Sequence, residues 1–152
     1  MAERREDVWT RLRRWHARLG GFRLRDVWWL AQITGMAAVV AVARHRLSLP
    51  RLVRLFDAAP RGRAGDWRRL NLLTRGVLRR LHRRDFCLPH ALILFRFCRR
   101  WGYDTRLFIG ARKGQDGLDG HAWVRIDGQG VPGLTPPDEH FATFFTYPEA
   151  TP

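Results

Sequence analysis

The residues of this sequence most suited to chemistry are one cysteine and one histidine. Cys87 follows Asp85 and Phe86 and lies directly before the apolar run 91–95. Pro89 fits the first turn of a helix, so Cys87 is predicted to lie at a helix N-terminus. The exposed N–H groups and the dipole at such an end stabilise a thiolate, and a neighbouring protonated histidine lowers a cysteine pKa from about 8.5 to about 3.5–7.5. Cys87 is therefore the expected nucleophile.

His121 is the expected base for Cys87. It opens a predicted strand directly after Gly120, and Ala-Trp-Val follows it at 122–124. A cysteine nucleophile needs a base within hydrogen-bond reach, and that base needs a group that holds its orientation. We expect the missing side chain of Gly120 to let a substrate backbone or the cysteine helix come close. The pair predicts nucleophilic cysteine chemistry of the peptidase type.

Several acids are candidates for the group that orients His121. Asp127 lies six residues along the same predicted strand, roughly 20 Å away at ~3.3 Å per residue, and suits the turn that follows. If the chain folds back there, positions 134–136 face His121 and Asp138 is the nearest acid beyond them. Asp138 is therefore the expected third member of the site, and Asp127 is the second candidate. Two acids in the preceding loop stay open as further alternatives: Asp116 and Asp119.

The remaining cysteine and histidines are expected to have structural or surface roles. Cys98 lies among aromatic residues later on the same predicted helix, where it fits a small buried hydrophobe. At ~1.5 Å per residue it lies roughly 16 Å from Cys87, too far for a disulfide. His90 is expected to help cap that helix or to face solvent. Surface positions are expected for the other four: His16, His45, His82 and His140. No spacing among these groups suggests a metal ligand set, so neither a metal nor a cofactor is expected.

The order of the helices and strands predicted around these groups indicates an α+β fold. Apolar residues at spacings of three and four predict helices at 3–19 and 66–82, and apolar runs with helix start and stop residues predict helices at 26–45 and 87–101. A short helix is also predicted at 51–56. The period then changes to that of strands, predicted at 105–109 and 121–126, with a glycine- and aspartate-rich loop at 113–120 between them. Helices thus come first and antiparallel strands follow.

A breaker-rich segment at 59–65 separates two parts of the chain. We expect a helical N-terminal region over residues 1–60 and a catalytic core over residues 61–152. At 152 residues the chain is long enough to bury such a core without disulfides. Within the core, Asp-Gly at 127–128 should start a return strand, which the prolines that follow keep short.

The positive charge of the chain suits several partners but identifies none. There are 28 lysines and arginines against 14 aspartates and glutamates, a formal net charge of +14, and Lys113 is the only lysine. Such a charge suits nucleic acid or an anionic membrane. No recognised nucleic-acid motif accompanies it, so no nucleic acid is expected. Two cysteines that cannot pair, and an N-terminus without a signal-peptide pattern, predict a cytoplasmic protein.

The most apolar run, residues 27–43, is predicted to be a buried helix. It is short for the ~20 residues that span a membrane, and it contains Gln32, Thr34 and Gly35. Arginines flank the run at both ends, which suits either a soluble helix or a lipid headgroup layer. Peripheral membrane contact through 27–43 is therefore the alternative.

Three segments together resemble the transglutaminase-like, papain-related cysteine peptidases of lasso-peptide biosynthesis. They are Cys-Leu-Pro-His-Ala-Leu at 87–92, Arg-Leu-Phe-Ile-Gly at 106–110 and His-Ala-Trp-Val at 121–124, and the resemblance covers roughly 66–148. The chain is most similar to the stand-alone leader peptidase, one half of a split maturation protein. Its N-terminal helices lack the strand-rich pattern of the leader-recognition domain that fused members carry.

The resemblance implies that Cys87 attacks the peptide bond between the leader and the core of a ribosomally made precursor, and that His121 moves the proton. It implies three partners: the precursor peptide, a separate leader-recognition protein and an ATP-dependent macrolactam cyclase. The chain has no Gly-rich phosphate loop, so cyclisation is expected elsewhere. The chain departs from the family at the acid that usually follows the histidine on the return strand, because Pro132, Gly133 and Leu134 occupy that place.

Two other functions stay open. A basic, non-catalytic scaffold would use its arginines to hold an acidic leader, a nucleic acid or a membrane surface. A transglutaminase-like acyltransferase would keep the same cysteine and histidine but pass the acyl group to an amine in place of water.

Overall fold

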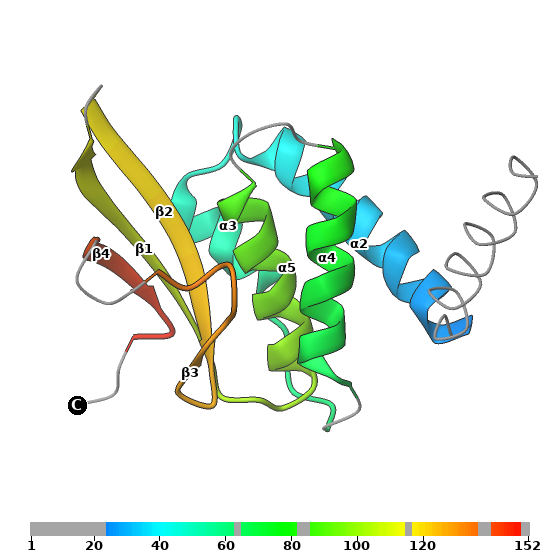
Figure 1. Cartoon of the computed structure of the whole chain (residues 1–152). Helices are drawn as coiled ribbons and strands as arrows, with labels where there is room; N and C mark the ends of the chain where they lie inside the picture. Colours follow the sequence, from blue (N-terminus) through cyan, green and yellow to red (C-terminus); the bar gives the residue numbers. More distant parts are fainter. Residues whose placement is uncertain (1–23, 63–64, 82–85, 115–116, 137–140, 150–152) are drawn as a thin grey trace, which may run out of the picture.

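The computed structural model describes residues 24–62, 65–81, 86–114, 117–136 and 141–149. Within them, four helices precede four strands (Figure 1). The helices are α2 (Leu24–Ala43), α3 (Leu49–Phe56), α4 (Trp67–Leu81) and α5 (Cys87–Arg100). The strands are β1 (Thr105–Gly114), β2 (Gly117–Ile126), β3 (Gln129–Gly130) and β4 (Ala142–Tyr147). The predicted α+β class is confirmed, and the helix expected at 3–19 lies outside the described residues.

The described strands form one antiparallel sheet in the order β3-β2-β1-β4. β1 and β2 pair along their whole length, so strand replaces most of the loop expected at 113–120. That expectation is wrong because the ladder overrides the glycine- and aspartate-rich pattern. Arg112 lies opposite Asp119 in this ladder and forms an ion pair with it at 2.9 Å. Opposite charges across two strands favour the paired form.

β4 is the strand that sequence patterns did not predict. It pairs with β1 at the edge of the sheet away from β3, and the register shifts between Ile109 and Gly110. Its sequence, Ala-Thr-Phe-Phe-Thr-Tyr, is rich in residues that favour strands. The residue types of 142–147 therefore do favour a strand. The strand was missed because it is short and its partner lies more than 30 residues earlier in the chain.

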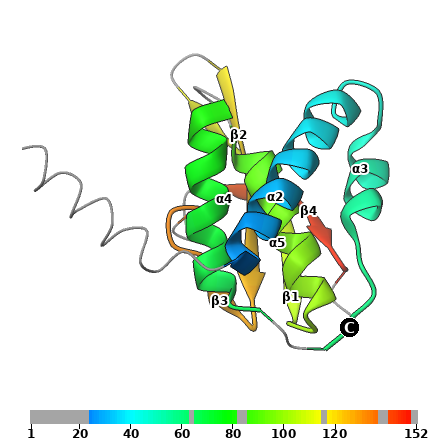
Figure 2. The same cartoon turned by 90° about the vertical axis from the view of Figure 1, so that its right-hand side faces the viewer.

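α5 is the central helix of the fold. It packs against β1 and β2 on one side and against α2 and α4 on the other (Figure 2). Five successive residues of this helix, 91–95, are fully buried. Burial on all sides explains why α5 has a continuous apolar run in place of a single apolar stripe. The helix that begins with Cys87 is thus held between two layers.

A partly buried ion pair joins α2 to α4. Asp26 is fully buried and accepts hydrogen bonds from the Nε of Arg69, at 2.9 Å, and from its Nη2. A buried carboxylate needs such a partner to remain charged. This pair joins the N-terminal helices to the part of the chain that holds Cys87. The division expected near residue 60 stays a prediction.

The two faces of α2 differ in burial. Trp29 and Ile33 are buried against the neighbouring helices, so the predicted burial holds for this face. The opposite face is apolar but exposed, with Trp28 at 66% and Val42 at 60% exposure. Burial of the whole run is therefore wrong, because only one side of the helix packs on α4 and α5. By length and composition alone, residues 25–43 are long and apolar enough to cross a membrane.

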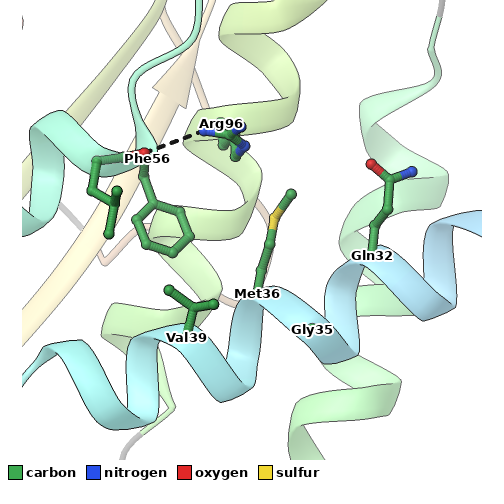
Figure 3. A pocket seen from close by; sticks show the side chains of 7 residues that line it. Gln32, Gly35, Met36, Val39, Phe56 and Arg96 are labelled. Atoms are coloured by element: carbon green, nitrogen blue, oxygen red, sulfur yellow. Dashed lines mark hydrogen bonds between the residues drawn. The ribbon is translucent and has the colours of Figure 1, made fainter.

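A groove lies beside the exposed face of α2 (Figure 3). It is bounded by α2, α3 and α5 and has a volume of about 450 Å³. Its lining is mostly apolar and consists of Gln32, Gly35, Met36, Val39, Leu55, Phe56 and Arg96. Arg96 donates a hydrogen bond to the Leu55 carbonyl at 3.2 Å, which brings a positive charge to the groove.

Candidate active site

Cys87 is the first residue of α5, as the sequence predicts. The residue before it, Phe86, offers no side-chain hydrogen bond to the first turn. The backbone N–H groups of that turn can therefore stabilise a negative charge placed at the helix end. Cys87 is partly exposed, whereas the second cysteine of the helix, Cys98, is buried.

The Cys87 thiol and the His121 ring lie close enough for each to shift the pKa of the other. The structure thus brings the two residues predicted for nucleophile and base into contact. The backbone N–H groups of Ala122 and Leu88 also favour the thiolate. Burial raises the pKa of Cys87, but the His121 ring with its charge and the two backbone N–H groups together lower it by more. The pKa of Cys87 therefore lies below its ordinary value.

The pKa of His121 moves in the opposite direction. The interaction with Cys87 is the largest cause and raises this pKa, while burial lowers it. The carbonyl of Leu134 and the charges of Cys87 and Asp119 raise it further. A lowered thiol pKa beside a raised imidazole pKa favours the thiolate–imidazolium pair. That pair is nucleophilic near neutral pH.

The backbone carbonyl of Leu134 orients the His121 ring. Nε2 of His121 lies 2.7 Å from this oxygen. Because a carbonyl oxygen can only accept, Nε2 must donate, and Nδ1 of the neutral ring keeps the lone pair that can take the proton of the Cys87 thiol. The carbonyl thus orients the ring, and the further orienting role expected of Asp138 stays a prediction.

Aromatic rings surround His121. Its ring centroid lies 6.0 Å from that of Trp123 and 5.2 Å from that of Phe141. Gly110 pairs with His121 across the sheet, and its backbone lies close to these rings. A Cβ at position 110 would lie 2.9 Å from the Ala142 carbonyl and 3.0 Å from the Trp123 ring. A side chain at position 110 would therefore displace the rings that pack on His121.

Gly120 does not have the role expected of it toward the cysteine helix. A Cβ at this position would meet nothing within 4 Å among the described residues. The sheet itself brings His121 to Cys87, because β2 packs directly on α5. Access of a substrate backbone at Gly120 stays a prediction.

The candidate acids have different outcomes. Asp138 and Asp116 lie outside the described residues, so their assignment stays a prediction. Asp127 has a left-handed backbone (φ 48°) at the β2–β3 turn, and its Oδ1 accepts the Asp104 N–H at 3.0 Å. The structure does not bring it to His121. Asp119 forms its ion pair with Arg112, and its charge acts on His121 without a hydrogen bond between them in the described contacts.

His90 is buried, so its expected role as a cap or solvent-facing residue is wrong. Its exposure is 0%, because position 90 of the central helix α5 faces α4. Nε2 of His90 lies 2.8 Å from Oδ1 of Asn71, a residue of α4. Burial, and to a lesser degree the charge of Arg75, lowers the pKa of His90 to about 4. The ring is therefore neutral at physiological pH.

Sequence reasoning missed two parts of this site. The first is the Leu134 carbonyl, although the hairpin geometry did place positions 134–136 opposite His121. A backbone acceptor has no residue type to reveal it. The second is Asn71, which resembles any polar residue within a helical pattern. Its contact with His90 joins residues 19 positions apart, so no local spacing signals it.

The described part of the chain contains no group of three or more histidine, cysteine, aspartate or glutamate residues able to hold a metal ion. The family model of the transglutaminase-like superfamily matches residues 29–146, and the chain belongs to this superfamily. Membership suggests a cysteine hydrolase- or acyltransferase-type activity. No curated protein and no solved structure matches the chain.

Proposed function

We propose that this protein is a cysteine endopeptidase that removes the leader peptide from a ribosomally synthesised lasso-peptide precursor. The observation that carries the proposal is the pairing of Cys87 with His121, whose interaction lowers the thiol pKa and raises the imidazole pKa. Nucleophilic attack on a peptide bond requires both properties. A cysteine with a packing role requires neither.

In the proposed reaction, the Cys87 thiolate attacks the carbonyl carbon of the scissile bond. The C=O electron pair moves onto the oxygen, where negative charge develops. The backbone N–H of Cys87 is the candidate donor to this oxygen, because Pro89 has no N–H and the His90 N–H donates to the Phe86 carbonyl. Protonated His121 then gives its proton to the leaving nitrogen as the C–N bond breaks. The amine product leaves, and a thioester remains on Cys87.

Water completes the reaction. Neutral His121 takes a proton from water, the oxygen adds to the thioester carbonyl, and the C–S bond breaks to release a carboxylate and restore the thiolate. An amine in place of water would give acyl transfer, which is the second candidate function. Membership of the transglutaminase-like superfamily supports both reactions. Their products differ, because hydrolysis leaves a carboxylate and acyl transfer leaves an amide.

The choice of a lasso precursor as substrate is supported by the resemblance of the segments 87–92, 106–110 and 121–124. We accordingly propose that a separate leader-recognition protein presents the precursor. An ATP-dependent macrolactam cyclase would then take the freed core. Both cysteines are free, which supports a cytoplasmic location.

The exposed face of α2 supports a docking place for the recognition protein. Val39 and Val42 are 47% and 60% exposed, and the groove beside them is apolar with Arg96 in its lining (Figure 3). Covering such a face is favourable, and a concave groove suits protein side chains better than the flat surface of a bilayer. The net charge of +14 favours an acidic partner over a second copy of this chain.

Two variants test this docking place. Val42→Glu puts a charge on the exposed face of α2, and Leu118→Glu is the matched control because Leu118 is 83% exposed on the β1–β2 hairpin. Calorimetry with the purified recognition protein should show binding at least about tenfold weaker for Val42→Glu alone. Equal binding by both variants would contradict the site. Binding to phosphatidylcholine–phosphatidylglycerol vesicles that only Val42→Glu loses would assign the face to lipid.

The activity itself is tested with precursor peptide, recognition protein and this chain, followed by mass spectrometry. We expect one cut between leader and core, with a free carboxylate on the leader. An amine-linked leader as the main product would establish the acyltransferase. An uncut precursor in the presence of folded protein and a functional recognition protein would reject the peptidase and favour the basic scaffold.

A further inference from the structure

The turn that presents the Leu134 carbonyl is fastened to β2. We call residues 131–135 the Leu134 turn. The N–H groups of Leu134 and Thr135 donate to the Val131 carbonyl at 3.1 and 2.9 Å. The Thr135 hydroxyl accepts the Val131 N–H at 2.7 Å and donates to the Val124 carbonyl at 2.9 Å. These bonds fix the shape of the turn and one of its sides.

The other side of the Leu134 turn is held from the helices. Asn71 of α4 donates from Nδ2 to the Pro132 carbonyl at 3.2 Å. Oδ1 of Asn71 lies 2.8 Å from Nε2 of His90. Because this amide oxygen can only accept, His90 donates from Nε2. A directed chain of hydrogen bonds thus runs from His90 on α5, through Asn71, to the Leu134 turn.

This chain lies in the interior of the protein. Asn71 is 5% exposed and His90 is 0% exposed. A buried amide that loses a partner is destabilised by the full loss of solvation, so both contacts resist breaking. Burial and the Arg75 charge lower the pKa of His90 to about 4. The His90 ring is therefore neutral near neutral pH. The direction of the hydrogen bonds is therefore fixed at neutral pH.

We propose that Asn71 and His90 are positioning residues for His121: they hold the Pro132 carbonyl, and so keep the Leu134 carbonyl on Nε2 of the His121 ring. The proposal rests on the proposed function in that Cys87 and His121 must act as a reactive pair. Neither positioning residue touches the reacting atoms. His90 follows Cys87 by one turn of α5, so one helix carries both the nucleophile and the far end of the chain that orients the base.

The consequence of breaking the chain is chemical as well as structural. A Leu134 turn released from α4 would no longer keep its carbonyl on His121. The imidazolium would lose an acceptor that stabilises it, and the thiolate paired with it would form at a higher pH. The charged and titratable groups that act on His121 in the described contacts, Cys87 and Asp119, are not altered by a change at Asn71.

The pH dependence of Cys87 alkylation by iodoacetamide, followed by mass spectrometry, tests the proposal. Asn71→Asp keeps an acceptor for His90 but removes the donor to Pro132, and Asn71→Leu removes both. In each variant the alkylation rate at pH 6 should fall about tenfold, equivalent to a rise of one pH unit in the midpoint. His90→Gln, which retains an N–H donor, should keep more of the wild-type profile than His90→Leu.

Thr74→Val is the matched control. Thr74 lies on α4, is fully buried, and its hydroxyl hydrogen-bonds to none of the described residues. It should leave the alkylation profile unchanged, while protection of Cys98 reports that each variant is folded. A wild-type profile in folded Asn71→Leu, which adds no charge, would overturn the proposal.

Nitrogen NMR of the wild-type imidazole rings gives a second measurement that needs no variant. Neutral His121 should carry its proton on Nε2, and a lone pair on that nitrogen would also overturn the proposal. The alkylation assay uses no precursor peptide. Failure of the peptidase assignment would appear as uncut precursor with the predicted alkylation shifts intact, and is thus distinguishable.

Discussion

The two ends of α5 carry the same thiol group and give it opposite properties. Cys87 at the first turn has a lowered pKa, whereas burial and, to a lesser degree, the Asp127 charge raise the pKa of Cys98. Burial is the largest cause at both positions and acts in the same direction. Only Cys87 also meets a histidine and backbone N–H groups that outweigh it. Thiol reactivity in this protein is therefore decided by what the helix end contacts.

The largest expected effect separates the two cysteines by activity. Cys87→Ala should lower leader removal by at least about 10³-fold, because no other group can form the thioester. Cys98→Ala should keep activity within about twofold and lower the free energy of unfolding by about 1 kcal/mol, through lost packing. Mass spectrometry of the precursor and urea unfolding measure these outcomes. Full cleavage by Cys87→Ala would show that Cys87 is not the nucleophile.

The second effect shows what makes the Cys87 end reactive. In His121→Ala the sulfur loses the interaction that lowers its pKa most, so the pKa of Cys87 should rise. The rate of iodoacetamide alkylation at pH 6 should fall about 100-fold. His45→Ala, at an exposed histidine, is the control and should match the wild type. An unchanged rate in His121→Ala would mean that the helix end alone activates the thiol.

The third effect concerns the buried histidine next to Cys87. The pKa of His90 is about 4 in the folded protein, against 6.5 for an unperturbed imidazole ring. Between these values the unfolded chain binds a proton that the folded protein excludes, so His90 makes stability fall as the pH falls. At pH 5 this loss is about 2 kcal/mol relative to neutral pH. Urea unfolding of wild type and His90→Gln at pH 7 and pH 5 isolates it, because the variant should lose less stability.

The smallest effect sharpens the comparison at the Cys98 end. Asp127→Asn keeps an acceptor for the Asp104 N–H and removes a charge that acts on Cys98. It should leave the midpoint of Cys87 alkylation within about 0.3 pH unit of wild type. A larger rise in this midpoint would show that Asp127 stabilises the Cys87–His121 pair. The same assay on Asp138→Asn tests the sequence-based assignment of that residue.

The sequence predicted those features that depend on neighbouring residues. Pro89 and the apolar run after it located the start of α5, and the change of period after Gly102 located the sheet. Cys87 and His121 were predictable because each was expected at the start of its own element. The ladder from β1 to β2 then ran further than the glycine and aspartate residues suggested, since pairing across strands outweighed local turn preference.

What orients His121 could not be predicted in this way. The contact from Asn71 to Pro132 spans 61 residues, and its acceptor is a backbone atom. His90 looked like a surface or capping residue because its spacing from Cys87 is local, whereas its burial depends on α4 packing against α5. Positions that combine a distant partner with a main-chain acceptor leave no pattern in residue types.

Because the acceptor at Leu134 is a main-chain oxygen, this contact with His121 does not depend on the residue type at position 134. Every amino acid supplies the same acceptor, so alanine scanning through 134 would report only the loss of a core side chain that is 3% exposed. The shape of the turn that carries residue 134, and not the residue type at that position, therefore decides whether the acceptor reaches His121.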